Sequence, residues 1–359
     1  MESVNKVRFK LNASERTSAS HIKNSSIVMA FLILLAIAAF LISFTVGRYS
    51  IPLSQLLSIF AGKLFNLPAA WPEAVETVLF QVRIPRILTA MLVGGALALS
   101  GASYQGLFRN PMVSPDILGV SSGAGFGASL AILLSFGTTG IQLTAFLFGL
   151  GAVFLVFSIS LIVGRKKNTT LVLVLTGMVV SSLFSSFTSM TKYVADTESK
   201  LPDITFWLMG SLARSRNLKD VGIFLIPLAL GAIPIILLRW RMNVLSFGEE
   251  EAQALGVNTK RIRIVIIICS TLLTAASVSV SGMIGWIGLI IPHIARLLVG
   301  PDYKRLIPAS LLIGSSFLML VDDIARSAFS IEIPLGILTS LTGAPFFIYL
   351  LLKGRNGWT

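Results

Sequence analysis

Long apolar segments separated by short polar ones run through almost the whole chain. Each is close to the roughly 20 residues that a helix needs to cross a bilayer. Helices are expected because lipid cannot satisfy open backbone groups. The pattern predicts an all-α polytopic membrane protein with ten transmembrane helices, at Ser26–Val46, Ile87–Tyr104, Leu118–Phe136, Thr144–Val163, Leu171–Tyr193, Val221–Leu238, Ile264–Val280, Met283–Val299, Leu306–Val321 and Pro334–Leu352.

The polar segments predict the domain organisation. Residues 1–26 form an N-terminal tail, 27–353 the membrane domain and 354–359 a C-terminal tail. The N-terminal tail has no apolar core or cleavage site of a signal peptide. Residues 47–81 and 194–220 are expected outside the membrane, with short interfacial helices in the first of them.

The basic residues predict an orientation rather than a nucleic-acid partner. The net charge is +13, although only 13% of the residues are charged and 54% are hydrophobic. About two thirds of the 29 Lys and Arg residues fall on the side that holds both termini. Basic residues gather on cytoplasmic loops, so both termini are expected in the cytoplasm. One cysteine and two histidines leave too few ligands for a metal centre of those residues.

The most charged stretch is the loop 242–263, which we call the charged loop. Gly248 and Gly256 suit the two ends of a short helix of about two turns. Its first turn is acidic, which suits the helix dipole, and basic residues follow its end. Such a helix could dock into a partner; the alternative is an ordinary solvated loop. Its residues are Glu249, Glu250, Glu251, Ala252, Gln253, Ala254 and Leu255.

Three arginines mark the opposite side of the predicted membrane domain. Arg83 and Arg86 begin the second span with Pro85 between them, and a spacing of three places both on one face. Arg326 lies at the end of the ninth span. Arginines near helix ends often extend to the interface. The other interpretation is a receptor site for carboxylates of an extracytoplasmic partner.

Small polar residues give a weaker signal. Span five carries Ser182, Ser185, Ser186 and Ser189 on neighbouring helical positions. These serines could line a pathway, or they could serve close packing and bond back to the helix. His293 beside Pro292 is expected to be a buried, hydrogen-bonded residue.

The chain shows no energy source of its own. His293 is the one clearly internal ionisable residue expected in the spans, whereas ion-coupled carriers place carboxylates, Lys or Arg there. The chain also lacks the GxxxxGK[ST] loop that binds ATP phosphates, so it is not expected to be an enzyme. A partner that supplies energy through the charged loop would explain how transport is driven without an energy source in this chain.

Four motifs in order resemble the FecCD-type permeases of bacterial ABC importers, which carry ferric siderophores, haem and vitamin B12. They are RIPR with GGALALSGASYQGLFRNPMVSPDILGVSSGAGFG (83–127), GEEEAQALGV (248–257), GMIGWIGLIIPHIARLLVGPDYKRLIP (282–308) and IPLGILTSLTGAPFFIYLL (333–351). The resemblance implies the type II ABC importer permease fold in a bacterial or archaeal cytoplasmic membrane. It also implies a permease dimer, of identical or different chains, with two ATPase subunits and an extracytoplasmic binding protein.

The resemblance also implies roles for individual residues. Gly248 to Val257 would couple to the ATPase, which would bind the ATP and Mg while this chain binds no cofactor. Arg83, Arg86 and Arg326 would face acidic residues of the binding protein. The cytoplasmic gate would comprise Asn110, Met112, Thr169 and Thr170, the last two on a loosely matching segment.

The expected function is ATP-driven import of an iron siderophore or related metal chelate. Cobalamin or haem import is the alternative within the family. An ion-coupled secondary carrier and a membrane scaffold or sensor remain as other classes, and which chelate is carried stays open.

Overall fold

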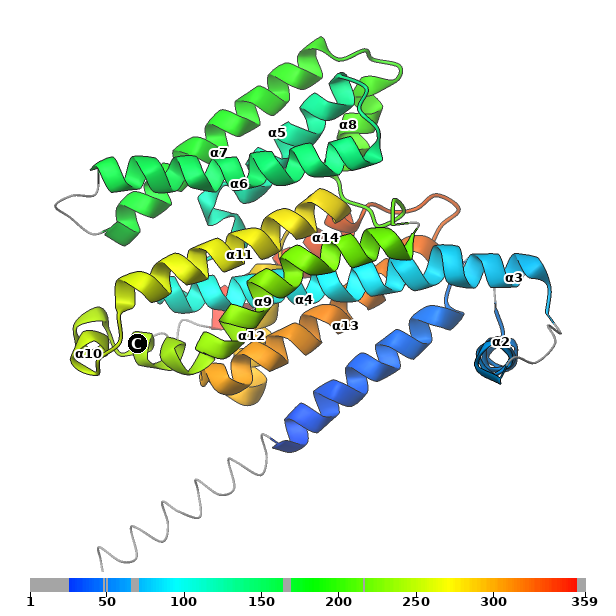
Figure 1. Ribbon diagram of the computed structural model, residues 1–359, viewed down its shortest axis with the longest axis horizontal. Coiled ribbons are helices and arrows are strands. Elements are labelled where there is room, and N and C mark those ends of the chain that lie inside the picture. Colours follow the sequence, from blue (N-terminus) through cyan, green and yellow to red (C-terminus); the bar gives the residue numbers. More distant parts are fainter. Residues whose placement is uncertain are drawn as a thin grey trace, which may run out of the picture.

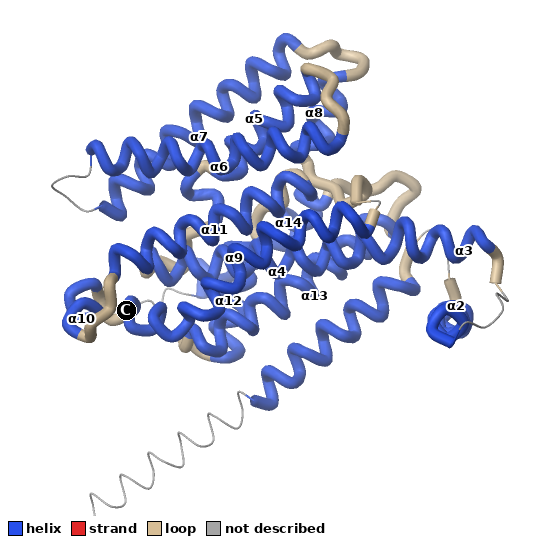
Figure 2. The backbone as a smooth tube through the Cα atoms, in the orientation of Figure 1, coloured by secondary structure: helices blue, strands red, loops and turns tan. Residues whose placement is uncertain are grey.

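The computed structural model describes residues 26–353, apart from residues 48, 50, 66–70, 164–168 and 216 and the side chains of 53, 169, 170, 351 and 353. Residues 1–25 of the predicted N-terminal tail and the whole predicted C-terminal tail, residues 354–359, lie outside the described residues. Within the described ranges the chain consists of helices and loops, with no strand (Figure 2).

The helices follow the predicted spans closely. They are the first helix Ser26–Thr45, α2 Leu53–Phe65, α3 Glu73–Thr77, the π-helical turn η1 Val78–Arg83, α4 Ile84–Phe108, the 3₁₀ turn η2 Pro115–Leu118, α5 Val120–Leu133, α6 Thr138–Val163, α7 Thr169–Val194, α8 Lys200–Leu208, α9 Leu218–Ser246, α10 Glu249–Ala254, α11 Thr259–Ser281, α12 Ile287–Val299, α13 Tyr303–Ser327 and α14 Leu335–Lys353.

The predicted all-α membrane architecture is confirmed. Among the described residues, seven helices are long and apolar enough to cross a membrane, and α5, α12 and α14 are shorter apolar helices. Together they match the ten predicted spans. The polar segment 47–81 carries the short helices α2 and α3, as expected.

Several boundaries differ from the prediction, each for a local reason. The second span is longer, because α3, η1 and α4 form one continuous helix, Glu73–Phe108. Pro85 lies in the first turn of α4, where its missing N–H is tolerated after the π-helical turn. The third and eighth spans start later, at Val120 and Ile287, because the residues just before them, Gly119 and Trp286, have φ of 80° and 71° and are not helical.

The structure also shortens the charged loop. Helix α9 continues to Ser246, and α11 begins at Thr259. The loop between the two membrane helices is therefore residues 247–258. Lys260, Arg261 and Arg263 belong to the first turns of α11, so they are not part of the C-terminal turn of α10.

Helix α4 is the centre of the larger group of helices, and α9, α11, α12 and α13 surround it. Close approach requires glycine at one crossing: a Cβ on Gly94 would overlap the carbonyl oxygen of Gly314 in α13, and the reverse also holds. Helices α5 to α8 form a second group beside α11 (Figure 1).

The two ends of the bundle carry different chemistry. Helix α10 lies at one end, which we call the α10 end, and α3 lies toward the other (Figure 1). The first helix begins toward the α10 end (Figure 1), and the last turns of α14 lie beside Pro111 and Met112, near the same end. Ten membrane-spanning helices, an even number, place the start and the end of the membrane domain on the same side. Which end faces the cytoplasm stays a prediction.

Candidate functional site

At the α10 end, two glycines bracket the short helix as the sequence predicted. Gly248 precedes Glu249–Ala254 with φ of 133°, and Gly256 follows it with φ of 77°. The N–H of Val257 donates to Ala252 O at 2.9 Å, and that of Gly256 to Gln253 O at 2.9 Å. This pair of bonds is the Schellman ending, which favours glycine at the left-handed position.

Helix α10 has a buried side and an exposed side. Ala252 is fully buried and Val257 is 9% exposed, so both fasten the helix to the protein. Leu255 is 66% exposed, and Glu250 and Ala254 are also exposed. An exposed leucine beside small and acidic residues forms a surface that a partner could cover. We call Glu250, Ala254 and Leu255 the α10 surface.

The base of α10 is held by polar contacts. Glu249 forms an ion pair with Arg263 of α11. Gln253 donates to the hydroxyl of Thr259 at 3.2 Å, and Asn258 caps α11 by accepting from the N–H of Arg261 at 3.0 Å. At the end of α9, Asn243 donates to Asp302 at 2.6 Å. The helix is therefore joined to α11 and, through α9, to the start of α13.

The predicted gate turn shares a groove with the charged loop. The groove has a volume of about 940 Å³ and is lined by residues 107–110, by Leu171 and Val174 of α7, and by residues 247–251 with Arg263. Asn110 and the coupling residues Gly248, Glu249 and Glu250 are thus brought together. The sequence alone does not show this proximity, because Asn110 and the coupling residues are 138 or more positions apart in the chain.

The turn itself is rigidly hydrogen-bonded. Arg109 adopts the left-handed conformation at the end of α4, with φ of 48°. Asn110 donates through its N–H to Gln105 O at 3.1 Å, and its side chain accepts from Met112 N at 2.9 Å. Met112 is 38% exposed and lines a different hollow, against His293 and Phe347.

Two predicted gate residues are only partly placed. Thr169 and Thr170 begin α7, but their side chains lie outside the described residues. Their backbone directly precedes Leu171, which lines the groove. The gate role of all four residues stays a prediction.

The serine face of α7 lies on the surface of the single chain. Ser182, Ser185, Ser186 and Ser189 are all exposed. The hydroxyl of Ser186 donates to Ser182 O, and that of Ser189 to Ser185 O, each at 3.0 Å. The helix thereby satisfies these two hydroxyls itself, and the face that they form is only weakly polar.

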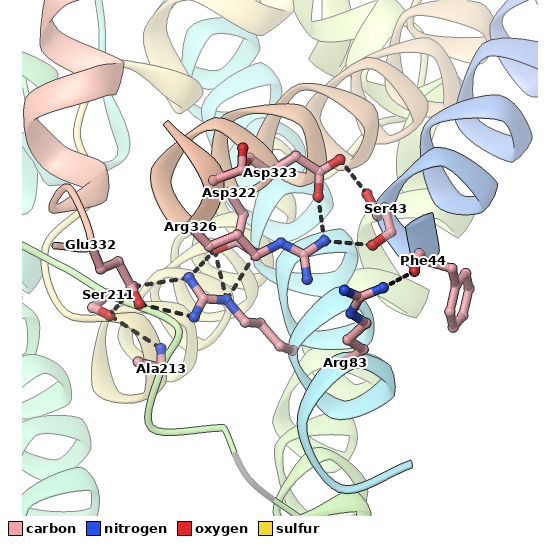
Figure 3. A network of polar contacts seen from close by, with 11 residues as sticks. Ser43, Phe44, Arg83, Ser211, Ala213, Asp322, Asp323, Arg326 and Glu332 are labelled. Atoms are coloured by element: carbon pink, nitrogen blue, oxygen red, sulfur yellow. Dashed lines mark hydrogen bonds and ion pairs between the residues drawn. The ribbon is translucent and has the colours of Figure 1, made fainter. Parts of the chain in front are cut away.

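At the other end, the three predicted arginines come together, but they are buried. Arg83, Arg86 and Arg326 are 2%, 7% and 8% exposed. We call this end the arginine end, and the three arginines with Asp322, Asp323 and Glu332 the arginine cluster (Figure 3). The three carboxylates balance the three guanidinium charges.

Arg86 has the most extensive ion pairing. Its Nε contacts both oxygens of Asp322, at 3.0 and 2.9 Å, and its Nη2 contacts Asp322 Oδ1 at 2.7 Å. Its outer edge meets Glu332, with Nη1 and Nη2 at 3.0 and 2.9 Å from the two carboxylate oxygens. Two carboxylates therefore hold one guanidinium in place.

The other two arginines join this cluster to the first helix. Arg326 donates to Asp323 and to the carbonyl of Ser43, and the Ser43 hydroxyl donates to Asp323 at 2.7 Å. Arg83 donates to the carbonyls of Phe44 and Tyr49. In the described part of the chain Arg83 makes no ion pair.

This cluster corrects one expectation from the sequence. Asp322 and Asp323, expected beyond the end of span nine, lie in α13 and are buried, so His293 is not the one internal ionisable residue. Their spacing of three and four before Arg326 was a signal that an intrahelical pair would form. Glu332, from a loop, carried no such signal.

The comparisons with known proteins agree with this architecture. A family model described as the FecCD transport family matches residues 34–353. The molybdate import system permease protein MolB of Haemophilus influenzae is 45% identical over 331 residues, 92% of this chain and 96% of MolB. A Helicobacter pylori protein, named a probable iron chelatin transport system permease protein, is 40% identical over 284 residues, 79% of this chain and 85% of that protein.

A solved structure extends the agreement to the fold. It is an inward-facing conformation of an ABC transporter of metal-chelate type. The TM-score is 0.81 at 44% sequence identity, over 91% of this chain and 99% of that one. With a match along nearly the whole membrane domain and full-length relatives that are transport permeases, the chain belongs to the FecCD transport family and is a permease of the ABC importer type.

Proposed function

We propose that this chain is the membrane subunit through which a binding-protein-dependent importer moves a metal chelate, using ATP hydrolysed by a partner. Two ATPase subunits would bind at the α10 end, in the cytoplasm, and supply the ATP and Mg site. A binding protein would dock at the arginine end, outside, and a second permease chain would complete the pathway.

The α10 surface is the observation that carries this proposal. It presents an exposed leucine and alanine on a helix whose opposite side is buried and whose ends are set by glycine. A rigid helix of this kind suits transmission of force, because motion of a bound partner would pass directly into α9 and α11. The groove shared with the turn after α4 gives that motion a short route to the gate.

The serine face supports a pathway between two chains. It is exposed in one chain, weakly polar, and lies on a membrane-crossing helix. A second copy or a related chain facing it would enclose these hydroxyls. Weak polarity suits passage, since a tightly binding site would retain the solute.

Molybdate is a second candidate solute. It is favoured by the similarity to MolB, a molybdate import permease whose match covers 92% of this chain. The iron chelatin relative and the metal-chelate type structure favour the chelate. Both candidates are metal-containing solutes that a separate binding protein would select.

The test is uptake into proteoliposomes that contain this chain, its ATPase and its binding protein. A ferric siderophore, haem, cobalamin and molybdate are offered in turn. One solute should be taken up with ATP inside and not without it. Uptake without the ATPase that collapses with an uncoupler would establish a secondary carrier instead, and no flux of any solute would favour a scaffold or sensor.

Docking at the arginine end gives a separate prediction. Arg83→Gln removes a guanidinium that has no carboxylate partner in the described chain, while an amide can still donate to the carbonyls of Phe44 or Tyr49. Capture of the binding protein should weaken several-fold and depend less on salt, because a long-range attraction is lost. Lys219→Gln, which removes an exposed cation from the first turn of α9, in the other segment expected outside the membrane, is the matched control. Equal capture by the Arg83 variant and the parent chain at low and high salt would argue against docking there.

A further inference from the structure

Glu332 is the carboxylate of the arginine cluster that is best placed to move. Its side chain is 25% exposed, against 2% for Asp322 and 6% for Asp323. It lies in the loop between α13 and α14, whereas the two aspartates are held in α13. A loop side chain can change its position without moving a helix.

Glu332 covers the edge of Arg86 that a partner would use. Asp322 holds Nε and shares Nη2, on the side facing α13, while Glu332 pairs with Nη1 and Nη2. Removal of Asp322 would leave a buried guanidinium poorly compensated. Removal of Glu332 would leave Arg86 still paired with Asp322. Glu332 can therefore be displaced at a lower free-energy cost than Asp322.

A pocket reaches this edge. It has a volume of about 230 Å³ and is lined by Arg83, Arg86, Arg326 and Glu332, with Gly47, Tyr49, Val78 and Val82 around them. The apolar lining would exclude water from an entering side chain. A single carboxylate on a short stem fits this chemistry, because three guanidiniums converge on the pocket.

We propose that Glu332 is an internal competitor for the partner's carboxylate: it occupies the outer edge of Arg86 until an acidic side chain of the binding protein replaces it. This inference rests on the proposed docking of a binding protein at the arginine end. An exchange of one carboxylate for another keeps the cluster neutral, so docking does not add a buried charge. It also lowers the affinity, because the internal pair must first be broken.

The exchange would also affect contacts outside the pocket. Glu332 also accepts from the hydroxyl of Ser211 at 2.8 Å. Ser211 N donates to Ser281 O at 2.8 Å, at the end of α11, and Gly210 O accepts from Leu335 N at 3.0 Å, at the start of α14. Release of Glu332 would therefore remove its hydrogen bond to Ser211, which lies where α8, α11 and α14 meet and where the two helix groups are joined.

The experiment uses Glu332→Gln in the assembled transporter in nanodiscs, with the dissociation constant of the binding protein measured at fixed salt. The variant should bind about tenfold more tightly, because a charged bidentate pair no longer competes. The matched control is Glu73→Gln, the same change on an exposed residue of α3, which should alter binding less than twofold. Ser211→Ala removes the second partner of Glu332, leaves Arg86 untouched, and should tighten binding by a smaller factor.

The outcomes separate this inference from the proposed function. If the parent transporter does not capture the binding protein, the docking function itself is wrong. If the parent captures it and both variants bind with the parent's dissociation constant, or more weakly, the internal competitor is refuted while docking stands. Melting temperatures of the variants equal to the parent's exclude misfolding as the cause of either result.

Discussion

Ala254→Trp should abolish the stimulation of ATP hydrolysis by the loaded binding protein while leaving this chain folded. Ala254 is exposed on the α10 surface, so an indole there meets no part of its own chain that must be repacked. A close-fitting ATPase cleft would have to accommodate it. Overpacking of a fitted interface costs about 1–3 kcal/mol, which is roughly fivefold to a hundredfold in affinity for the ATPase.

Glu250→Arg tests the same surface through charge. Both variants are measured as purified complexes, with the rate of ATP hydrolysis with and without loaded binding protein, and with ATPase retention on size-exclusion chromatography. Glu198→Arg, an exposed residue between α7 and α8 and outside the α10 surface, is the matched control and should keep full stimulation. Full stimulation in both α10 variants would rule out this helix as the coupling element.

Asp322→Ala should strongly destabilise the chain. The carboxylate is buried and makes three contacts to Arg86, with a further approach of 3.8 Å to Nε of Arg326. Its loss leaves a buried guanidinium with Glu332 alone. Breaking a buried pair by removing one partner typically costs about 3–5 kcal/mol.

Thermal unfolding followed by tryptophan fluorescence in detergent measures this effect. The paired change Asp322→Leu with Arg86→Met removes both charges and keeps the volume filled, so it should melt closer to the parent than Asp322→Ala does. Asp220→Ala, an exposed acid in the first turn of α9, should change the melting temperature little. A parent-like melting temperature for Asp322→Ala would contradict the role assigned to this pair.

The helices and the short α10 turn were predictable because their causes are local. Twenty apolar residues in a row specify a span wherever the rest of the chain lies. Gly248 and Gly256 specify the ends of α10 because only a residue without Cβ adopts their φ values readily. Some span boundaries shifted because a local rule was missed, as at the π-helical turn before Pro85.

The sequence predicted which arginines lie at the arginine end, but not that they are buried and paired with carboxylates. The sequence places three arginines at helix ends, and their proximity in the structure agrees with that. It does not show that they are buried, because Arg86 pairs with residues 236 and 246 positions away. Interactions at such separations depend on which helices pack together, here α4 against α13, and no local pattern encodes that choice.

What the amino-acid sequence alone determined is therefore the membrane class, the ten spans and the glycine-bracketed helix, since hydrophobicity and backbone conformation act over neighbouring residues. Tertiary packing alone decided that the arginines are neutralised from within and that the turn at Asn110 shares a groove with the charged loop. The reason is physical: a guanidinium buried among helices needs carboxylate or carbonyl oxygens within hydrogen-bond distance, about 3 Å, and only the folded chain brings them there.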